Sequence, residues 1–585
     1  MRLRDFPVFD FSGGLVKNKS DYKMQKNEVK NSLNFDLDER GRAKTRRGIQ
    51  QFGTASFGGA VIDNSYVWIS QGAGASIFPY HLVIDRATDA TLYRIVGAYT
   101  TSAIATTDTT INIGGLGLLT STNSSVEING DIISYTGSTT TTLTGCAGIL
   151  KAHPTRSPVY QIQSIGKANV AVDTSCGAYF TTLNNLLIVN GRTGSATFDG
   201  TNFTAIADAD EPNGLFATNY RQRVYVAGSL ASGATSKSYR ISYSAAGDAT
   251  NWISTDWFEI EDDRGEEITA LLENGDLLLI FKMNSIWTYN EIQAKQRIYN
   301  VGAYNQRVVQ KIGKLIYTFC PTGVYVTNGL STKKISQPVD EILKGFVPVY
   351  DAAATYGRVV LNCCAGQFEN KYYLYLGDLT YPESSADVVL IYDTTTGKWT
   401  VHNAYPNMTH FGSFKRFCSR PNSLTEGLYV SQSKEALFVG DSAGVYYRLF
   451  EGRFYDNGVS GAPTPLLCGD DLYANLVANS SGSPISSVLE TPFYDMGNPS
   501  WWKKFGFLRI LIEQGEFNVS YRLDKGTHFT DWISLRNFKN PNGRMPLNVE
   551  GYRIALKITS NQKANKGIFN GFIIEDIEAL NKHGR

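Results

Sequence analysis

Short apolar strands recur along residues 165 to 455, most of them closing at a Gly, Asn or Asp, and they constrain the fold more than any other feature. Apolar β-branched and aromatic residues favour strands, while Gly, Asn and Asp favour turns. Groups of such strands return at intervals of roughly 40–50 residues, the period of four-stranded propeller blades. We therefore predict a β-propeller over residues 166–455. The clearest of these segments are 186–191, 223–228, 277–281, 323–329, 372–376, 389–393 and 437–446.

A chain of 585 residues is too long for one core, because single cores stop growing at roughly 250–300 residues. We expect an arm and hairpin over 1–50 and first propeller strands over 51–165. A Thr- and Ser-rich β module (about 90–165) is inserted there, around the hairpin signal Asn129-Gly130. A linker over 456–485 and a β-sandwich over 486–585 complete the chain. No long amphipathic helix is evident, so the predicted class is all-β.

The predicted hairpin near the N-terminus has strands over 31–38 and 43–48 joined by a turn at 39–42. It carries a basic run: Arg40, Arg42, Lys44, Arg46 and Arg47. On a strand, alternate positions share a face, so the cations at 40, 42, 44 and 46 are expected together. We interpret them as a solvated hairpin face rather than a nucleic-acid site.

The formal net charge of +1 gives no bulk field for gripping nucleic acid or an anionic membrane. No stretch approaches the ~18 consecutive apolar residues that span a bilayer, and the N-terminus lacks an apolar signal core. The seven cysteines are scattered without Cys-x-x-Cys spacing, which is typical of reduced, buried thiols. These features indicate a protein assembled in a cytoplasm.

A search for catalytic and cofactor motifs finds no nucleophile elbow, no phosphate-binding loop and no zinc-protease motif. The six histidines are dispersed, and we expect them to be structural or surface residues. Asp248 with Trp252, and Asp524 with Trp532, resemble only loosely the Asp-box turn of sialidase propellers. No carboxylate pair stands out for glycoside hydrolysis. The expectation is a protein without enzymatic activity, cofactor or metal.

The densest charge cluster is an acidic run that lacks the alternating spacing of a calcium loop. We interpret it as a solvated acidic loop, and in a DNA conduit it would repel phosphate. Its acidic members are Glu259, Glu261, Asp262, Asp263, Glu266 and Glu267.

The opening segment Asp10-Phe-Ser-Gly-Gly-Leu15, then Asn31-Ser-Leu-Asn34, then Gly41 with Lys44, Arg46, Arg47 and Gly48, carries a family resemblance. It resembles the N-terminus of the tail nozzle (tail tubular protein B-like) and head-completion stabilisation proteins of short-tailed bacteriophages. Arg42 and Ala43 stand where that family often has a Leu. The resemblance marks seven residues as candidate interaction residues: Phe11, Gly13, Gly14, Gly41, Arg46, Arg47 and Gly48.

Later blocks are similar to the same family and follow its order. They are 221–228, 241–252, 266–287, 323–336 and 438–446 in the propeller, 132–154 in the module, and 489–505 at the start of the sandwich. The resemblance implies a virion tail protein that closes a homo-oligomeric, hexameric ring beneath an adaptor ring. The ring would extend the portal channel, retain double-stranded DNA without reading its sequence, and conduct it during ejection. Tail fibres or a needle are further implied partners.

Two other functions remain open at this point. A receptor-binding tail protein would use the inserted module or an exposed loop to bind a host glycan. A propeller glycan hydrolase would degrade capsular or lipopolysaccharide substrates. Binding of the isolated protein to host cells distinguishes the first, and degradation of such a substrate distinguishes the second.

Overall fold

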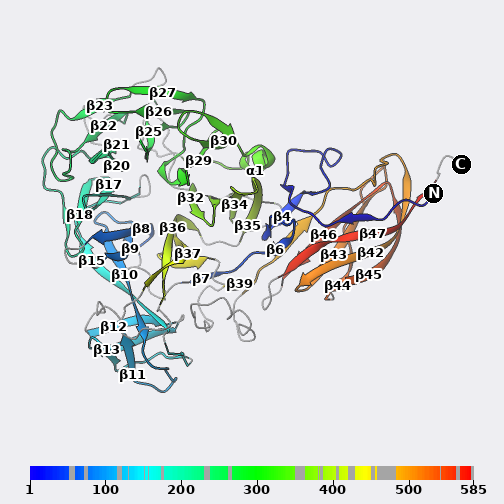
Figure 1. The fold of residues 1–585 in the computed structure, drawn as a ribbon, viewed down its shortest axis with the longest axis horizontal. Coiled ribbons are helices and arrows are strands. Elements are labelled where there is room, and N and C mark those ends of the chain that lie inside the picture. Colours follow the sequence, from blue (N-terminus) through cyan, green and yellow to red (C-terminus); the bar gives the residue numbers. More distant parts are fainter. Residues whose placement is uncertain are drawn as a thin grey trace.

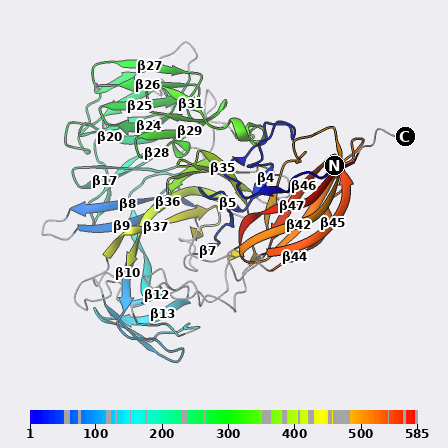
Figure 2. The same cartoon turned by 45° about the vertical axis from the view of Figure 1, so that its right-hand side comes forward.

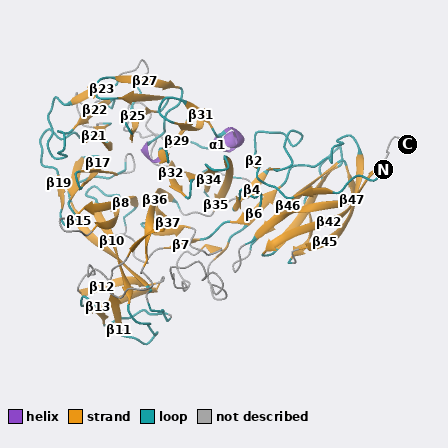
Figure 3. Ribbon diagram, viewed as in Figure 1, coloured by secondary structure: helices purple, strands orange, loops and turns teal. Residues whose placement is uncertain are grey.

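The fold is taken from a computed structural model, which describes part of the 585-residue chain. The described residues are 1–51, 60–71, 77–114, 122–128, 131–150, 152–155, 157–172, 177–228, 238–260, 266–349, 363–377, 379, 381, 387–403, 407–418, 429–449, 455–456, 483–539, 542–561 and 567–580. Almost all regular structure in them is β-strand (Figure 3). The predicted all-β class, with a propeller, an inserted module and a C-terminal sandwich, is confirmed.

Seven groups of four strands among the described residues stand around a common axis as propeller blades (Figure 1). Five of them are separate four-stranded sheets, and two belong to larger sheets. Neighbouring strands within each blade are antiparallel, and in blades 2 to 6 they follow one another in the sequence, so these blades are built from local sequence. The strands of the first four blades are β8(Ile62–Gln71), β9(Ile77–Asp85), β10(Thr91–Thr100) and β15(Pro158–Lys167); β16(Tyr179–Leu183), β17(Leu186–Gly191), β18(Gly194–Phe198) and β19(Phe203–Ala205); β20(Phe216–Tyr220), β21(Arg223–Ala227), β22(Arg240–Tyr243) and β23(Trp257–Glu259); and β24(Ile268–Asn274), β25(Leu277–Lys282), β26(Ser285–Tyr289) and β27(Ala294–Tyr299).

The remaining three blades continue the circle back to the first. Blade 7 lies against blade 1 through contacts of β36 with β8, and it takes its outermost strand from the N-terminal segment, so the ring closes on residues distant in sequence. Their strands are β28(Gln310–Ile312), β29(Leu315–Cys320), β30(Gly323–Thr327) and β31(Thr332–Lys334); β32(Cys363–Phe368), β33(Lys371–Leu376), β34(Val388–Asp393) and β35(Lys398–Asn403); and β36(Met408–Cys418), β37(Tyr429–Asp441), β38(Tyr446–Leu449) and β7(Ile49–Gln51).

The inserted module is continuous with blade 1, because strands β10 and β15 extend beyond the blade and into the module (Figure 2). Its own strands are β11(Thr110–Gly114), β12(Thr122–Ile128), β13(Asp131–Ser138) and β14(Thr142–Thr144), which extend the blade into an eight-stranded sheet. A separate apolar cluster that includes Ile111, Val126 and Ile133 forms its core. β12 and β13 pair as predicted, while the turn residues Asn129 and Gly130 lie outside the described residues.

Two sheets form the C-terminal sandwich, and each contains strands from the N-terminal segment. One sheet has the order β45-β42-β47-β6-β5, with β1 also on β47; the other runs β4-β41-β46-β43-β44. Their strands are β1(Phe6–Val8), β4(Asn31–Leu33), β5(Phe35–Leu37), β6(Ala43–Thr45), β41(Ser487–Glu490), β42(Trp502–Gln514), β43(Phe517–Asp524), β44(Ile533–Phe538), β45(Asn542–Gly551), β46(Arg553–Ser560) and β47(Ile568–Leu580). Most of the predicted linker over 456–485 lies outside the described residues.

Strand β4 joins the propeller to the sandwich. Leu33 pairs with Val401 of β35 on one side and with Val488 of β41 on the other. Blade 6 therefore continues through β4 into a nine-stranded sheet. Next in sequence, Asn34 has a positive φ of 58°, a conformation that Asn tolerates better than most residues, so the chain turns out of this sheet into the β5–β6 hairpin. The predicted strand over 31–38 is thus two strands in different sheets.

A buried ion cluster ties the blades together at the propeller axis. Arg307 lies in η1(Gln306–Val308), a turn inside the ring of blades (Figure 3). Its Nη2 donates to Asp63 of β8 at 2.5 Å and its Nη1 donates to the carbonyl of Thr409 on β36 at 2.7 Å. Asp63 also accepts from Arg86 Nε at 2.9 Å and from the Ala178 N–H at 2.7 Å. The cluster thus joins blades 1 and 7, the strand entering blade 2 and the connection before blade 5.

Two imidazoles lie in the same interior. His81 Nε2 is 3.0 Å from the Tyr446 hydroxyl, and His410 Nε2 is 3.1 Å from the Ser65 hydroxyl. Burial lowers the pKa of His81 to about 3, and burial together with the charge of Arg307 lowers the pKa of His410 to about 3. Both rings are therefore neutral in the folded protein.

Acid is expected to unfold the propeller partly through these two histidines. Between their ordinary pKa of 6.5 and about 3, the unfolded chain binds protons that the folded chain excludes, so stability is lost as the pH falls through this window. Replacing both His81 and His410 by Gln removes these sites, and the midpoint of acid unfolding, followed by circular dichroism, should move to lower pH. Replacing the exposed His528 by Gln serves as the control. Equal midpoints for the parent and the double variant would contradict this account.

Candidate functional site

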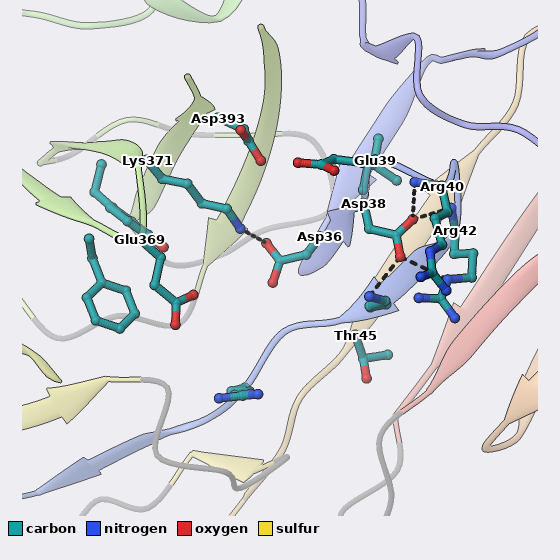
Figure 4. Close-up of a pocket in the computed structure, with 14 residues that line it drawn as sticks. Asp36, Asp38, Glu39, Arg40, Arg42, Thr45, Glu369, Lys371 and Asp393 are labelled. Carbon is teal, nitrogen blue, oxygen red and sulfur yellow. Dashed lines mark hydrogen bonds and ion pairs between the residues drawn. The ribbon is translucent and has the colours of Figure 1, made fainter. Parts of the chain in front are cut away.

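A polar cavity of about 510 Å³ lies where the β5–β6 hairpin faces blade 6, and we call it the junction cavity (Figure 4). Strands far apart in sequence build it, because β4 brings the hairpin against blade 6. Its lining contains five carboxylates and five cations, together with the apolar side chains of Leu37, Phe368 and Tyr373. The lining residues are Asp36, Leu37, Asp38, Glu39, Arg40, Arg42, Lys44, Thr45, Arg47, Phe368, Glu369, Lys371, Tyr373 and Asp393.

The hairpin side of the junction cavity is held by ion pairs around Asp38. Its carboxylate accepts from Arg42 Nε at 2.9 Å and lies 2.7 Å from Lys44 Nζ, and Arg42 also reaches Glu513 on β42 at 2.9 Å. Burial works against ionisation of Asp38, but the hydrogen bonds from Lys44 and from the N–H of Arg42 hold its pKa below the ordinary value. The cations at positions 42 and 44 are therefore engaged within the subunit.

The blade side is centred on Lys371, whose ammonium lies 3.7 Å from Asp36. Asp36 raises the pKa of Lys371 against the effect of burial, and Asp393 and Glu369 add to the rise. Burial opposes ionisation of Asp36, but Lys371 and His402 outweigh it and hold the pKa of Asp36 well below the ordinary range. Both groups of this pair are charged at neutral pH.

Among the described residues, Glu39, Glu369 and Asp393 form no ion pair within 4.0 Å, although Glu369 and Asp393 lie near enough to Lys371 to raise its pKa. Glu39 and Asp393 point toward one another across the cavity (Figure 4). The described residues hold no group of three His, Cys, Asp or Glu side chains arranged to bind a metal ion.

Arg46 lies at the base of the junction and is fully buried, unlike the solvated hairpin face that we expected. Its Nε donates to Asn34 Oδ1 at 2.8 Å, its Nη1 to the Arg47 carbonyl at 3.0 Å and its Nη2 to the Asn403 carbonyl at 2.9 Å. Asn34 in turn donates to the carbonyl of Ser486. Residue alternation alone could not foresee this, because β6 ends at Thr45 and Arg46 leaves the strand.

Replacing Arg46 by Met is expected to lower the free energy of unfolding by at least about 1–3 kcal/mol, because buried carbonyl and amide oxygens lose their donor. Met keeps the apolar stem, so the change removes mainly hydrogen bonds. Chemical denaturation measures the effect, and Arg40→Met, at an exposed hairpin position, is the matched control. An Arg46 variant as stable as the control would show that these hydrogen bonds do not stabilise the junction.

Phe11, Gly13, Gly14 and Gly41, four of the candidate interaction residues, make packing contacts within the subunit. Phe11 is fully buried with its ring 5.8 Å from that of Phe569, and its N–H donates to the Gly41 carbonyl. Gly14 and Gly41 have φ values of +74° and +75°, which favour glycine. A Cβ on Gly13 would lie 2.5 Å from the Asn27 carbonyl oxygen, so this site needs glycine for close packing.

Arg47 lines the junction cavity and Gly48, next to it in the sequence, is buried, whereas Gly41 packs against Asp10 of the N-terminal arm. The acidic run is not part of the junction cavity. Glu259 pairs with Arg240 at 2.8 Å, Glu266 accepts from the Asn284 amide at 2.7 Å, and Glu267 is buried. Glu261, Asp262 and Asp263 lie outside the described residues, so the exposure of this run to a channel stays a prediction.

Sequence reasoning missed the acids on the blade side of the cavity and the ion cluster at the axis. Glu369 lies in the turn between β32 and β33, Asp393 is the last residue of β34, and neither carries a motif. Asp63 and Arg307 are 244 positions apart, and nothing in their local sequence indicates the pairing. The four cysteines whose side chains are described, Cys146, Cys320, Cys363 and Cys364, are buried free thiols, as expected. No helix among the described residues is long and apolar enough to cross a membrane.

No protein-family model matches the chain, and no curated protein matches its sequence. Similar solved structures include BamB from Moraxella catarrhalis, at 10% identity over 69% of this chain and 99% of that one, with a TM-score of 0.31. The Pan2 WD40 domain of Neurospora crassa is 8% identical over 69% and 94%, with a TM-score of 0.31. The phage phi92 endosialidase is 13% identical over 66% and 65%, with a TM-score of 0.24. The fold assignment therefore stands on the strand pairing described above.

Proposed function

We propose that this chain is a structural subunit of a bacteriophage tail nozzle, which assembles into a ring and extends the channel through which DNA leaves the capsid. The proposal starts from the ordered sequence blocks between Asp10 and Phe505 that resemble this family. It assigns the chain a mechanical role, in which the subunit must keep its shape while DNA passes.

The observation that carries the proposal is the nine-stranded sheet that runs from blade 6 through β4 into the sandwich. Backbone hydrogen bonds across β4 couple the two domains, whereas domains linked by a flexible segment move relative to one another by default. The N-terminal segment also supplies the outer strand of blade 7 and strands of the other sandwich sheet. A subunit whose two domains share strands in this way suits the wall of a channel that must resist deformation.

The buried Arg307–Asp63 cluster stands inside the ring of blades, so in this proposal the DNA passage lies between subunits and not along the propeller axis. Head-to-tail contacts between identical subunits close such a ring around an axis outside each subunit. The near-neutral charge is compatible with DNA that slides, since a strongly basic wall would hold phosphate.

Electron microscopy of the purified protein and of intact virions tests the proposal. The expected result is a six-fold ring with an open axial passage wide enough for duplex DNA, located between the capsid and the tail tip. A protein that stays monomeric in the virion, or that is located at fibre tips, would overturn the proposal and favour a receptor-binding role.

A further inference from the structure

Blade 7 meets blade 1 along an interface that we call the closing seam, because it completes the circle of blades. Its polar members are Ser65 and His81 of blade 1 and Thr409, His410 and Tyr446 of blade 7. His410 Nε2 lies 3.1 Å from the Ser65 hydroxyl, and His81 Nε2 lies 3.0 Å from the Tyr446 hydroxyl. Each imidazole therefore makes a side-chain hydrogen bond from one blade to the other.

The closing seam is tightly packed beside these hydrogen bonds. A Cβ on Gly440 would lie 2.6 Å from the His410 ring and 2.7 Å from the Ile62 side chain. A Cβ on Gly412 would lie 2.1 Å from the Ser65 hydroxyl oxygen. An apolar cluster shared by the two blades adjoins them, with Ile62 and Val83 from blade 1 and Phe438 and Tyr446 from blade 7. A charge that forms here cannot be hydrated while the two blades stay in contact.

Positive charges already outnumber negative ones around His410. Arg307 and Arg86 both donate to Asp63, so two cations share one carboxylate. Burial and then the charge of Arg307 lower the pKa of His410 to about 3, and His81 and Arg86 add to this fall while Asp63 opposes it.

The remaining titratable groups packed at the seam do not balance these charges. They are Tyr179, whose ring lies 5.9 Å from the Arg307 guanidinium, Cys364 and Tyr446. Burial raises the pKa of Cys364 and of Tyr446, so both stay neutral. A proton on His410 would therefore add a positive charge to the cluster without adding a counter-ion.

The other blade interfaces are joined by groups that do not titrate in the acid range. Amide and hydroxyl side chains donate to backbone carbonyls across them: Asn64 to Ala178, Asn219 to Thr182, Tyr220 to Asp276, Gln306 to Leu271 and Gln310 to Ala365. An apolar cluster joins blades 6 and 7. The remaining described histidines lie outside the blade interfaces, with His153 in the inserted module, His402 facing the hairpin and His528 on the sandwich. Among the described residues, imidazoles thus join two blades at the closing seam alone.

We propose that the closing seam is an acid-sensitive latch, which opens locally when His81 and His410 take up protons while the other blade interfaces stay closed. Opening lets water hydrate both rings and separates His410 from Arg307 and Arg86. As the pH falls from the ordinary pKa of 6.5 toward about 3, only the open seam binds these protons. By about pH 4.5 this linkage should favour opening by at least about tenfold for each histidine. The inference concerns the single subunit and does not depend on the proposed nozzle role.

Hydroxyl-radical footprinting of the full chain tests the latch, because it reports which side chains meet solvent. Phe438 and Tyr446 are buried at the seam, and Phe281 and Tyr372 are buried in blades 4 and 6. On acidification from pH 7 to about pH 4.5, oxidation of the first pair should rise at least about fivefold, while that of the second pair should stay constant. Return to pH 7 should reverse the change. Equal rises at all four rings would mean that acid unfolds the propeller as a whole, and would overturn the proposal.

The double variant with His81→Gln and His410→Gln tests the cause of opening. Gln keeps a donor and an acceptor for Tyr446 and Ser65 but does not titrate, so this seam should stay closed at about pH 4.5. The matched control is His402→Gln, since His402 is also buried with a lowered pKa but lies outside the seam, and it should open like the parent.

Circular dichroism at pH 7 shows whether the double variant is folded. If it is not, the two single variants take its place, and each should move the midpoint of opening to lower pH. Variants that open with the parent's pH dependence would show that other groups drive opening, and the latch would be wrong.

Discussion

Replacing Asp63 by Asn is expected to lower the free energy of unfolding by about 3–5 kcal/mol, the usual cost of removing one partner from a buried ion pair. Asp63 is fully buried, and Arg307 and Arg86 both donate to it. An amide keeps the shape but not the charge, so two guanidinium groups would lose their counter-ion inside the propeller. Because the cluster joins several blades, the loss should lower the cooperativity of unfolding as well as its midpoint.

Denaturant titration followed by tryptophan fluorescence measures the Asp63 effect. Asp210→Asn is the matched control, because Asp210 is exposed in a turn and such surface changes usually stay within about ±0.5 kcal/mol. If the Asp63 variant unfolds at the same denaturant concentration as the control, the cluster does not stabilise the propeller.

The same cluster contributes to the response to acid. Burial opposes ionisation of Asp63, but Arg307 and Arg86 outweigh it and hold the pKa of Asp63 below its ordinary value of 3.8. The carboxylate therefore stabilises the folded protein fully above that value, and its contribution is lost as the pH falls through the lower pKa of the folded state. Acid sensitivity from Asp63 thus begins at lower pH than that from His81 and His410.

Local structure was well predictable from sequence because blades are hairpins. Leu186–Gly191 is the strand β17 with the predicted bounds, and Leu277–Lys282 and Lys371–Leu376 differ from the predictions by one residue at one end. In each case the apolar run and the turn residues that limit it are adjacent in the chain, so propensity and tertiary structure agree.

The contacts between distant segments were not predictable in the same way. The alternation over 31–38 predicts one strand, yet the positive φ of Asn34 divides it between two sheets. Arg46 reads as a surface cation, but its guanidinium satisfies carbonyl and amide oxygens that meet only in the folded chain. The junction cavity likewise depends on partners more than 300 positions apart, and no local pattern encodes that proximity.

Leu33 lies in β4, the strand that would transmit load between the propeller and the sandwich in the proposed role. It is almost fully buried in β4 and is paired on both sides, with Val401 and with Val488. Replacing it by Ala should cost about 2–5 kcal/mol, as for other large-to-small changes in cores. The shortened side chain would leave a void in the strand between the two domains. The propeller and the sandwich should therefore unfold less cooperatively.

Differential scanning calorimetry distinguishes this outcome from a general loss of stability. For Leu33→Ala we expect a lower first transition and a wider separation between the unfolding of the two domains. Leu315→Ala is the matched control, since Leu315 is 43% exposed on β29 and away from the junction. A uniform shift without separation would mean that β4 is only part of a common core. In that case the continuous sheet would not be the element that transmits load between the domains, and the proposed wall would need its stiffness from contacts between subunits.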